Sequence, residues 1–304
     1  MRTSLIKPSI WQIAFALLIG VFGISMAAVF VRLSSQKTGL NGIGFSLFLS
    51  ASRLIVSSLL IFPLWKGLSQ VKAQPGAFVY SVIAGICLAI HYVAWFLSLS
   101  YTSIAASVTI VTTNPIWVVL LYWILFKQKP MRQTLLGIFL ALLGALIIAY
   151  DGAITESIIT DNPLLGNFLA LIGSWVYSLY FLAGKEAQNK GLSTGIYAVI
   201  AYSSAGLVLL PLPYFFGSGY TGYPTIVYLY IFLMAVFSQI IGQTSLNWSL
   251  RWISPIIVTL AVMFEPVFSS IFAYIIFGEI PSFLLLIGAG ILLLGVGTAA
   301  VHSK

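Results

Sequence analysis

The sequence predicts an all-α integral membrane protein with ten transmembrane helices, arranged as two inverted five-helix repeats and with both termini in the cytoplasm. Its composition, its series of apolar runs and an internal repeat support this prediction. Of the 304 residues, 60% are hydrophobic and only 7% are charged, whereas a soluble domain carries about 25% charged residues. A surface with so little charge is suited to lipid.

Ten apolar runs, bounded by glycine, proline or charged residues, predict the helices. A span needs about 20 residues, so ten spans use roughly two thirds of the chain and leave short connections. The predicted helices are 11–32, 43–64, 77–100, 103–126, 131–150, 163–184, 194–214, 225–248, 252–277 and 281–301. The first run is too long for a signal peptide and has no convincing cleavage site, so it is interpreted as the first span.

The distribution of positive charge predicts the orientation, because cytoplasmic loops are rich in Lys and Arg. With the N-terminus inside, most of the 14 basic residues lie on the cytoplasmic side. These residues are Arg2, Lys7, Lys66, Lys72, Lys127, Lys129, Arg132, Lys185, Lys190, Arg251 and Lys304. Outside lie Arg32 and Lys37 with the acidic residues Asp151, Glu156, Asp161 and Glu279. Such scattered basic residues do not form the clustered face that nucleic-acid binding requires.

The second half of the chain repeats the first at an offset of 151 residues. The matching pairs are Asn114-Pro115 with Glu265-Pro266, Pro130 with Pro281, Gly137 with Gly288, and Gly144 with Gly295. We predict two repeats, 1–152 and 153–304. Since each has five spans, the second enters the membrane upside down. The charges agree, because Lys127, Lys129 and Arg132 become Gly278, Ile280 and Phe283 where the hairpin faces outward.

Inverted repeats of this kind are common in secondary transporters, which bind substrate near the bilayer midplane between the repeats. Polar residues inside the predicted spans are therefore candidate site residues. Glu265 stands directly before Pro266, near the middle of its predicted helix. It is a candidate proton carrier or substrate ligand; the alternative is a hydrogen-bonding group that ties two helices together. Its counterpart Asn114 is a candidate for substrate binding only.

Arg53 lies halfway along the second predicted helix, where a guanidinium group needs a carboxylate or carbonyl partner. The favoured interpretation is a structural ion pair with Glu265, and the alternative is a contact with an anionic group of the substrate. Two stripes are also predicted from spacings of three or four residues, which place side chains on one helix face. They are formed by His91, Trp95 and Ser98, and by Gln239, Gln243 and Asn247. Together with Tyr177, the residues His91, Gln243 and Asn247 are candidates for substrate binding.

The sequence contains no recognisable catalytic motif, phosphate-binding loop or metal-ligand pattern. The prediction is therefore a protein that is not an enzyme and has no cofactor or metal. The single cysteine, Cys87, is interpreted as a buried apolar side chain. Gly137, Gly144, Gly288 and Gly295 are assigned to close helix packing.

The chain resembles the EamA-type family of the drug/metabolite transporter superfamily. The resemblance rests on SPIIVTLAVMFEPVFSSIFAYIIFGEIPSFLLLIGAGILLLGVG at 254–297, NPIWVVLLYWILFKQKP at 114–130, SRLIVSSLL at 52–60 and SWVYSLYFL at 174–182. Gln128 stands where the family hairpin usually has Glu. The resemblance implies export or exchange of small metabolites, amino acids among them, by alternating access. It also implies that helices 1–4 and 6–9 surround a central cavity, with helices 5 and 10 at the periphery.

The resulting hypothesis is a secondary transporter that exports small metabolites, amino acids or similar amphipathic solutes across the plasma (inner) membrane, with proton coupling as an open question. Its expected partners are the small-molecule substrate, the lipid bilayer and protons, with no nucleic acid. Two alternatives remain open at this stage: a membrane scaffold or sensor subunit that does not transport, and an intramembrane enzyme.

Overall fold

The computed structural model describes residues 8–40, 42–71, 73–99, 101–102, 107, 110–127, 129–155, 162–278 and 280–302. Within these ranges the chain folds into helices and contains no β-strand. Eight helices are long and apolar enough to cross a membrane, and two shorter apolar helices span Asn114–Leu125 and Phe283–Ala299. These apolar helices follow the predicted order along the chain, and the protein is a multi-pass membrane protein.

The helices of the first half are α1 (Ile10–Thr38), α2 (Ile43–Leu60), η1 (Phe62–Gln70), α3 (Ala77–Leu99), α5 (Asn114–Phe126) and α6 (Arg132–Thr155). Those of the second half are α7 (Pro163–Asn189), α8 (Thr194–Leu209), α9 (Leu212–Phe215), α10 (Thr225–Leu233), η2 (Met234–Gln243), α11 (Thr244–Trp252), α12 (Pro255–Val262), α13 (Glu265–Phe277) and α14 (Phe283–His302). Arg2, Lys7, Lys72, Gln128, Glu156, Asp161, Glu279 and Lys304 lie outside the described residues.

Prolines account for two differences from the predicted bounds. The helix predicted at 43–64 ends at Leu60 and continues as the tighter helix η1, which contains Pro63. The helix predicted at 194–214 ends at Leu209, two residues before Pro211. A proline has no backbone N–H to continue the hydrogen-bond ladder of an α-helix, so the regular helix stops near it.

The helix predicted at 225–248 is continuous to Trp252, but its central part, η2, is a π-helix. Such wide turns are rare and are found frequently at functional sites. The segment brings Gly242 against α1, where a Cβ atom placed on Gly23 would lie 2.7 Å from the Cα of Gly242. The backbones of α1 and η2 therefore meet without intervening side chains.

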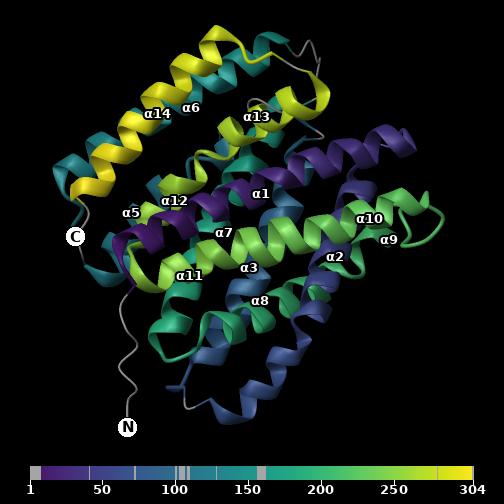
Figure 1. Cartoon of the computed structure of the whole chain (residues 1–304), viewed down its shortest axis with the longest axis horizontal. Coiled ribbons are helices and arrows are strands. Elements are labelled where there is room, and N and C mark those ends of the chain that lie inside the picture. The colour runs from purple at the N-terminus through teal and green to yellow at the C-terminus, as the bar shows by residue number, and fades with distance from the viewer. Residues whose placement is uncertain are drawn as a thin grey trace.

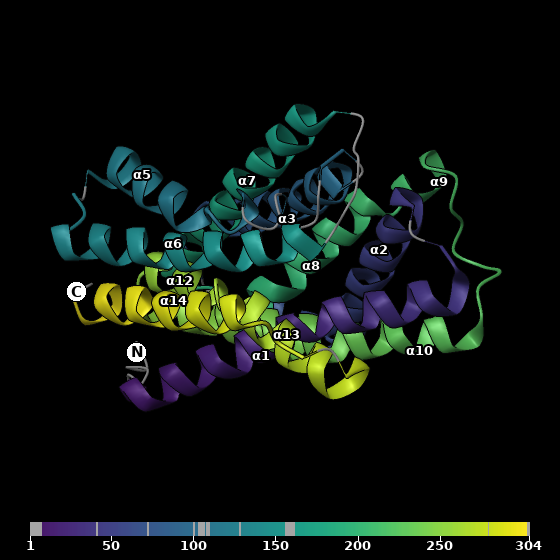
Figure 2. The same ribbon diagram turned by 90° about the horizontal axis from the view of Figure 1, so that it is seen from above.

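The two helices that end the repeats, α6 and α14, form a pair at one edge of the molecule, as both views show (Figure 1, Figure 2). Their contact is close because glycines face the partner helix. A Cβ atom on Gly144 would lie 2.5 Å from the carbonyl oxygen of Gly288, and one on Gly137 would lie 2.6 Å from Ala299. This confirms the packing role predicted for these glycines, and α6 and α14 are the peripheral pair that the family resemblance implies.

The fourth helix of each repeat contains a break just before the residue that the repeat matches. In the second repeat, α12 ends at Val262 and α13 begins at Glu265. In the first repeat, Thr112 and Thr113 form a turn and α5 begins at Asn114. A proline follows both residues and favours the first turn of a helix. Glu265 thus begins α13 and lies near the middle of the span Pro255–Phe277, where the sequence predicts a helix loosened by Pro266.

Both α5 and α13 end in the left-handed backbone conformation, at Lys127 with φ 57° and at Gly278 with φ 73°. Glycine adopts this conformation without steric cost, whereas a side chain disfavours it by about 1 kcal/mol. The first hairpin therefore keeps a lysine despite a small strain. This is consistent with a requirement for positive charge on that side of the membrane.

Candidate functional site

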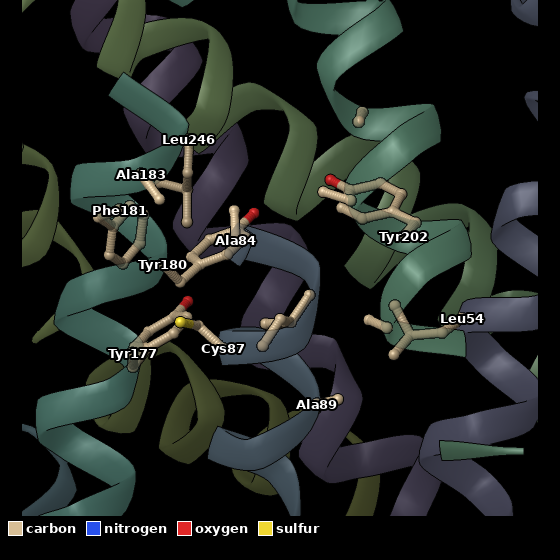
Figure 3. Packing of buried hydrophobic residues seen from close by; sticks show 14 of the residues in the cluster. Leu54, Ala84, Cys87, Ala89, Tyr177, Tyr180, Phe181, Ala183, Tyr202 and Leu246 are labelled. Atoms are coloured by element: carbon tan, nitrogen blue, oxygen red, sulfur yellow. The ribbon is translucent and has the colours of Figure 1, made fainter. Parts of the chain in front are cut away.

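A network of buried hydrogen bonds joins α7 to η2 and α11. The hydroxyl of Tyr177 donates to Oε1 of Gln243 at 3.2 Å, and Nε2 of Gln243 donates to the hydroxyl of Tyr180 at 3.2 Å. Nδ2 of Asn247 also donates to the Tyr180 hydroxyl, at 2.7 Å. These four side chains are at most 7% exposed. Figure 3 shows Tyr177 and Tyr180 on one helix, beside Ala84 and Cys87 of α3.

The network continues towards α8 through Asn247 and Tyr202. Nδ2 of Asn247 lies 3.2 Å from the hydroxyl of Tyr202, which lies 3.0 Å from the hydroxyl of Thr244. Figure 3 shows Tyr202 on its own helix, across from α7. The backbone carbonyl of Asn247 accepts from Nε2 of Gln188 at 2.9 Å. Gln243 and Asn247 of the predicted stripe thus act together.

Gln239, the third member of that stripe, takes part only through its backbone. It is 1% exposed, and its Nε2 has no hydrogen-bond partner within the described part of the chain. Its carbonyl oxygen accepts from the hydroxyls of Tyr202 and Thr244. The π-helical geometry of η2 changes the spacing that a regular α-helix would give.

His91 of α3 completes the aromatic wall on the other side of Tyr177. Its ring stacks on that of Tyr177, with centroids 4.3 Å apart and an interplanar angle of 18°. Nδ1 of His91 lies 3.0 Å from the carbonyl oxygen of Gly173 on α7. Ser98, which shares the predicted stripe with His91, instead contacts Ser107. His91 therefore belongs to the cluster around Tyr177, whereas Ser98 lies outside that cluster.

Asn114 lies at the start of α5, against α7. It is 1% exposed, and its Oδ1 has no hydrogen-bond partner among the described residues. The hydroxyl of Ser178 shares its proton between the carbonyl oxygen of Ser174 on its own helix, at 2.9 Å, and that of Asn114, at 3.1 Å. Because Ser178 lies on the first helix of the second repeat, the bond to Asn114 joins the two repeats.

Glu265 is held in the same way from the other side. The hydroxyl of Ser25, on the first helix of the first repeat, lies 2.7 Å from the carbonyl oxygen of Val21 on its own helix and 3.2 Å from the carbonyl oxygen of Glu265, so its one proton is shared between them. The side chain of Glu265 is partly exposed, and it lies at the N-terminus of α13, where the helix dipole favours a negative charge. The two broken helices are thus tied to opposite repeats by a serine each.

The expected ion pair between Arg53 and Glu265 is not formed. The guanidinium carbon of Arg53 lies 4.6 Å from the centre of the Tyr92 ring, in a cation–π contact. Arg53 is 7% exposed, and its Nε has no hydrogen-bond partner in the described ranges. Glu265 is nevertheless near enough to interact electrostatically with Arg53 and with the hydroxyls of Tyr92 and Tyr177. An aromatic ring face thus contacts the cation where a carboxylate was predicted.

The structure therefore brings His91, Tyr177, Gln243 and Asn247 into one connected cluster, with Asn114 and Glu265 at the two helix breaks beside it. Sequence reasoning missed Tyr92, Tyr180 and Tyr202. Only Tyr180 carried a signal, since it is one turn from Tyr177 on the same helix. Across the described residues, no group of three or more His, Cys, Asp or Glu side chains is placed to hold a metal ion.

The model of the EamA-like transporter family matches the chain twice, over residues 10–150 and 164–300. The chain belongs to the EamA-like transporter family. The double match also supports the two-repeat architecture of this EamA-like protein. Several curated relatives of the chain are named as transporters, and the chain is accordingly a membrane transporter protein in the broad sense.

Among these relatives is the uncharacterized transporter YyaM of Bacillus subtilis, 27% identical over 244 residues, which covers 80% of this chain and 79% of that protein. An uncharacterized transporter of Archaeoglobus fulgidus is 24% identical over 277 residues, covering 88% and 90%. The thiamine-repressible mitochondrial transport protein THI74 of Saccharomyces cerevisiae is 32% identical over 130 residues, covering 40% and 35%. A crystal structure at 16% identity superposes with a TM-score of 0.75 and covers 97% of this chain and 99% of the other; it supports the fold alone.

Proposed function

We propose that this EamA-like protein is a secondary transporter that moves a small metabolite, an amino acid or a similar amphipathic solute, out of the cell across the plasma membrane. The observation that carries the proposal is the pair of broken helices, one from each repeat, each held by a serine of the other repeat. Irregular backbone at membrane depth is tolerated where it is buried in protein or lines a cavity, and transporters bind substrate at such breaks.

The proposal includes ten spans, cytoplasmic termini and two inverted repeats at 1–152 and 153–304. Alternating access then consists of one repeat moving against the other around His91, Asn114, Tyr177, Gln243, Asn247 and Glu265. Glu265 is the proposed proton carrier, because it is the acidic group at a helix break and is partly exposed. The neutral Asn114 occupies the matching place, so protons would enter one half only.

The test uses purified protein in liposomes and measures counterflow of labelled amino acids and related metabolites. We expect saturable exchange of one compound class by the wild-type protein. An imposed gradient of about one pH unit supplies about 1.4 kcal/mol per proton, enough for a roughly tenfold accumulation. Glu265→Gln is expected to keep exchange without a gradient and to lose this accumulation. Equal accumulation by wild type and Glu265→Gln would rule out Glu265 as the proton carrier.

The same preparation separates transport from its alternatives. A scaffold or sensor needs no polar lining at the midplane, so replacing His91, Gln243 or Asn247 would leave its behaviour unchanged. An intramembrane enzyme would convert its substrate without any dependence on a gradient. Exchange that falls when these three residues are replaced individually, with no chemical change in the solute, supports transport against both alternatives.

A further inference from the structure

Three basic side chains gather where α5 ends and α6 begins, at one end of the molecule (Figure 2). Lys127 and Lys129 lie between the two helices and Arg132 begins α6, and all three side chains are exposed. Residues 127–132 include no acidic residue. We propose that these three cations, the basic hairpin, bind the headgroup of an anionic phospholipid whose acyl chains lie against α5 and α6. The inference concerns a lipid and is independent of the solute that the protein moves.

The matching hairpin of the second repeat shows that a turn of this shape needs no positive charge. At the offset of 151 residues, Gly278, Ile280 and Phe283 take the three places, and no Lys or Arg lies between them. Both hairpins contain a proline at the same position, Pro130 in the first and Pro281 in the second. In both, the residue that ends the preceding helix has a left-handed backbone. The cations of the first hairpin therefore have a role other than turning the chain.

Two of the cations stand where the backbone disfavours them. Lys127 has a φ of 57°, whereas its counterpart Gly278 adopts a φ of 73° without steric cost. Arg132 is the first residue of α6, and the positive end of a helix dipole disfavours a cation. The first turn of α6 contains no acidic residue that would offset this. The charge of Lys127 suits the C-terminal end of α5, but this does not account for Lys129 or Arg132.

The protein itself supplies no anion to the basic hairpin. Within the described ranges, none of its three cations contacts a carboxylate. Glu186 of α7 lies near enough to α5 to interact electrostatically with Tyr122, but its carboxylate accepts a hydrogen bond from Asn189 at 3.2 Å and also interacts with Lys185. Three like charges within six residues repel one another. An anion from outside the chain would relieve this repulsion.

The surface beside the basic hairpin identifies that anion as a lipid. On α5, Trp123 is 46% exposed and Leu125 is 59% exposed, and on α6 Leu135 is 47% exposed. Tryptophan is enriched at the level of the headgroups, and anionic headgroups attract Lys and Arg next to membrane spans. A free phosphate would meet the cations only, whereas a phospholipid also covers the apolar side chains with its acyl chains. A phospholipid with a net negative charge is therefore the ligand that fits both parts of this surface.

The experiment titrates the full-length protein, in a neutral detergent, with phosphatidylglycerol or with the zwitterionic phosphatidylcholine. Native mass spectrometry counts the bound lipid. We expect the wild-type protein to bind phosphatidylglycerol at least ~10-fold more tightly than phosphatidylcholine. Equal affinity for the two lipids would overturn the inference. Glycerol 3-phosphate, which has the phosphate without the acyl chains, should not displace the lipid. Displacement by glycerol 3-phosphate as effective as that by phosphatidylglycerol would indicate a site for free anions and would contradict the lipid.

Single substitutions assign the binding to the basic hairpin. Lys129→Gln should weaken binding of phosphatidylglycerol ~5-fold and leave that of phosphatidylcholine unchanged, because one of the attracting charges is lost. Lys66→Gln is the matched control, since Lys66 is an exposed lysine of η1, and its affinity should stay within ~2-fold of the wild type. Gel filtration checks that both variants are folded. An equal loss in both variants would indicate a general attraction of basic residues and would contradict a site at the hairpin.

Lys127→Gly separates lipid binding from a purely structural role of the hairpin. This change gives the first hairpin the residue that the second has at Gly278, so in neutral detergent the variant should unfold at a temperature at least as high as the wild type. Added phosphatidylglycerol should raise the unfolding temperature of the wild type more than that of the variant. An equal rise in both proteins would show that Lys127 does not contact the headgroup, and would contradict the inference.

Discussion

The two helix breaks are alike in backbone and different in chemistry. At both, a proline follows the first residue of the second helical segment, and a serine from the other repeat donates to that residue's carbonyl oxygen, at 3.1 Å for Asn114 and 3.2 Å for Glu265. The side chains differ, because one is a fully buried amide and the other is a partly exposed acid. The geometry is thus set by backbone contacts, and the side chain at each break is free to serve a separate purpose.

A comparison of the surroundings explains why the acid stands in the second repeat. Arg53 lies near enough to Glu265 to interact electrostatically with it. The hydrogen bonds around Asn114 involve neutral groups. Ser178 contacts the backbone carbonyl of Asn114, and the hydroxyl of the neighbouring Thr113 lies 3.2 Å from that of Ser174. Both breaks place their side chain at a helix N-terminus, but among the described contacts only Glu265 has a basic side chain near it.

The largest effect on stability should follow from placing a carboxyl group at the first break, where the second break has Glu265. Asn114→Asp places a carboxyl group at a position that is 1% exposed, and an acidic side chain deep in the membrane costs about 3 kcal/mol. We expect a clear loss of thermal stability in detergent. Thermal unfolding is measured by the change in tryptophan fluorescence on heating. Glu265→Gln, the reverse change at the other break, should cost less than about 1 kcal/mol. Equal stability of Asn114→Asp and wild type would show that both breaks tolerate charge.

A smaller effect on stability is expected from the polar network. This network lies within the second repeat, where it joins α7 to η2 and α11. Tyr180→Phe removes the hydroxyl that contacts both Gln243 and Asn247, and should destabilise the protein by about 2 kcal/mol. Tyr230→Phe is the matched control, because the ring contact of Tyr230 with Phe30 at 6.1 Å is retained. The same unfolding assay applies. Identical transitions for Tyr180→Phe and the control would mean that these bonds contribute nothing to stability.

The smallest effect on stability concerns the serine contact that both breaks share. Ser25→Ala and Ser178→Ala each remove one bond between the repeats, and a hydrogen bond between membrane helices contributes about 0.6 kcal/mol on average. We expect the two losses of unfolding free energy to agree with each other. A large loss for one serine and none for the other would contradict the equivalence of the two breaks.

The sequence predicted the helices and the repeat because these depend on local patterns. Apolar runs marked the spans in order, and the offset of 151 residues matched Asn114-Pro115 to Glu265-Pro266 before the structure showed a break at each. The prolines indicated a loosened helix at Glu265. They did not show that α12 ends before it, because a single proline is compatible with either a kink or an interruption.

The candidate site was predicted only in part, because its contacts join helices that are distant in sequence. His91 and Tyr177 were identified as intramembrane polar residues, but their ring stacking depends on how α3 packs on α7. Arg53 was paired with the available carboxylate, whereas its guanidinium group lies over the ring of Tyr92. Tyr92 and Tyr202 give no sequence signal, since a tyrosine in an apolar run is equally consistent with packing or with the membrane interface.

Paired cysteines in the two hairpins test whether the two halves of the chain cross the membrane in opposite directions. In a Cys87→Ala background, Lys129→Cys and Ile280→Cys probe positions that differ by the repeat offset of 151 residues and are exposed in both hairpins. A membrane-impermeant maleimide is applied to bacterial cells that produce each variant. We expect Ile280→Cys to be labelled in intact cells and Lys129→Cys only after permeabilisation. Labelling of both positions from the same side would contradict the inverted arrangement.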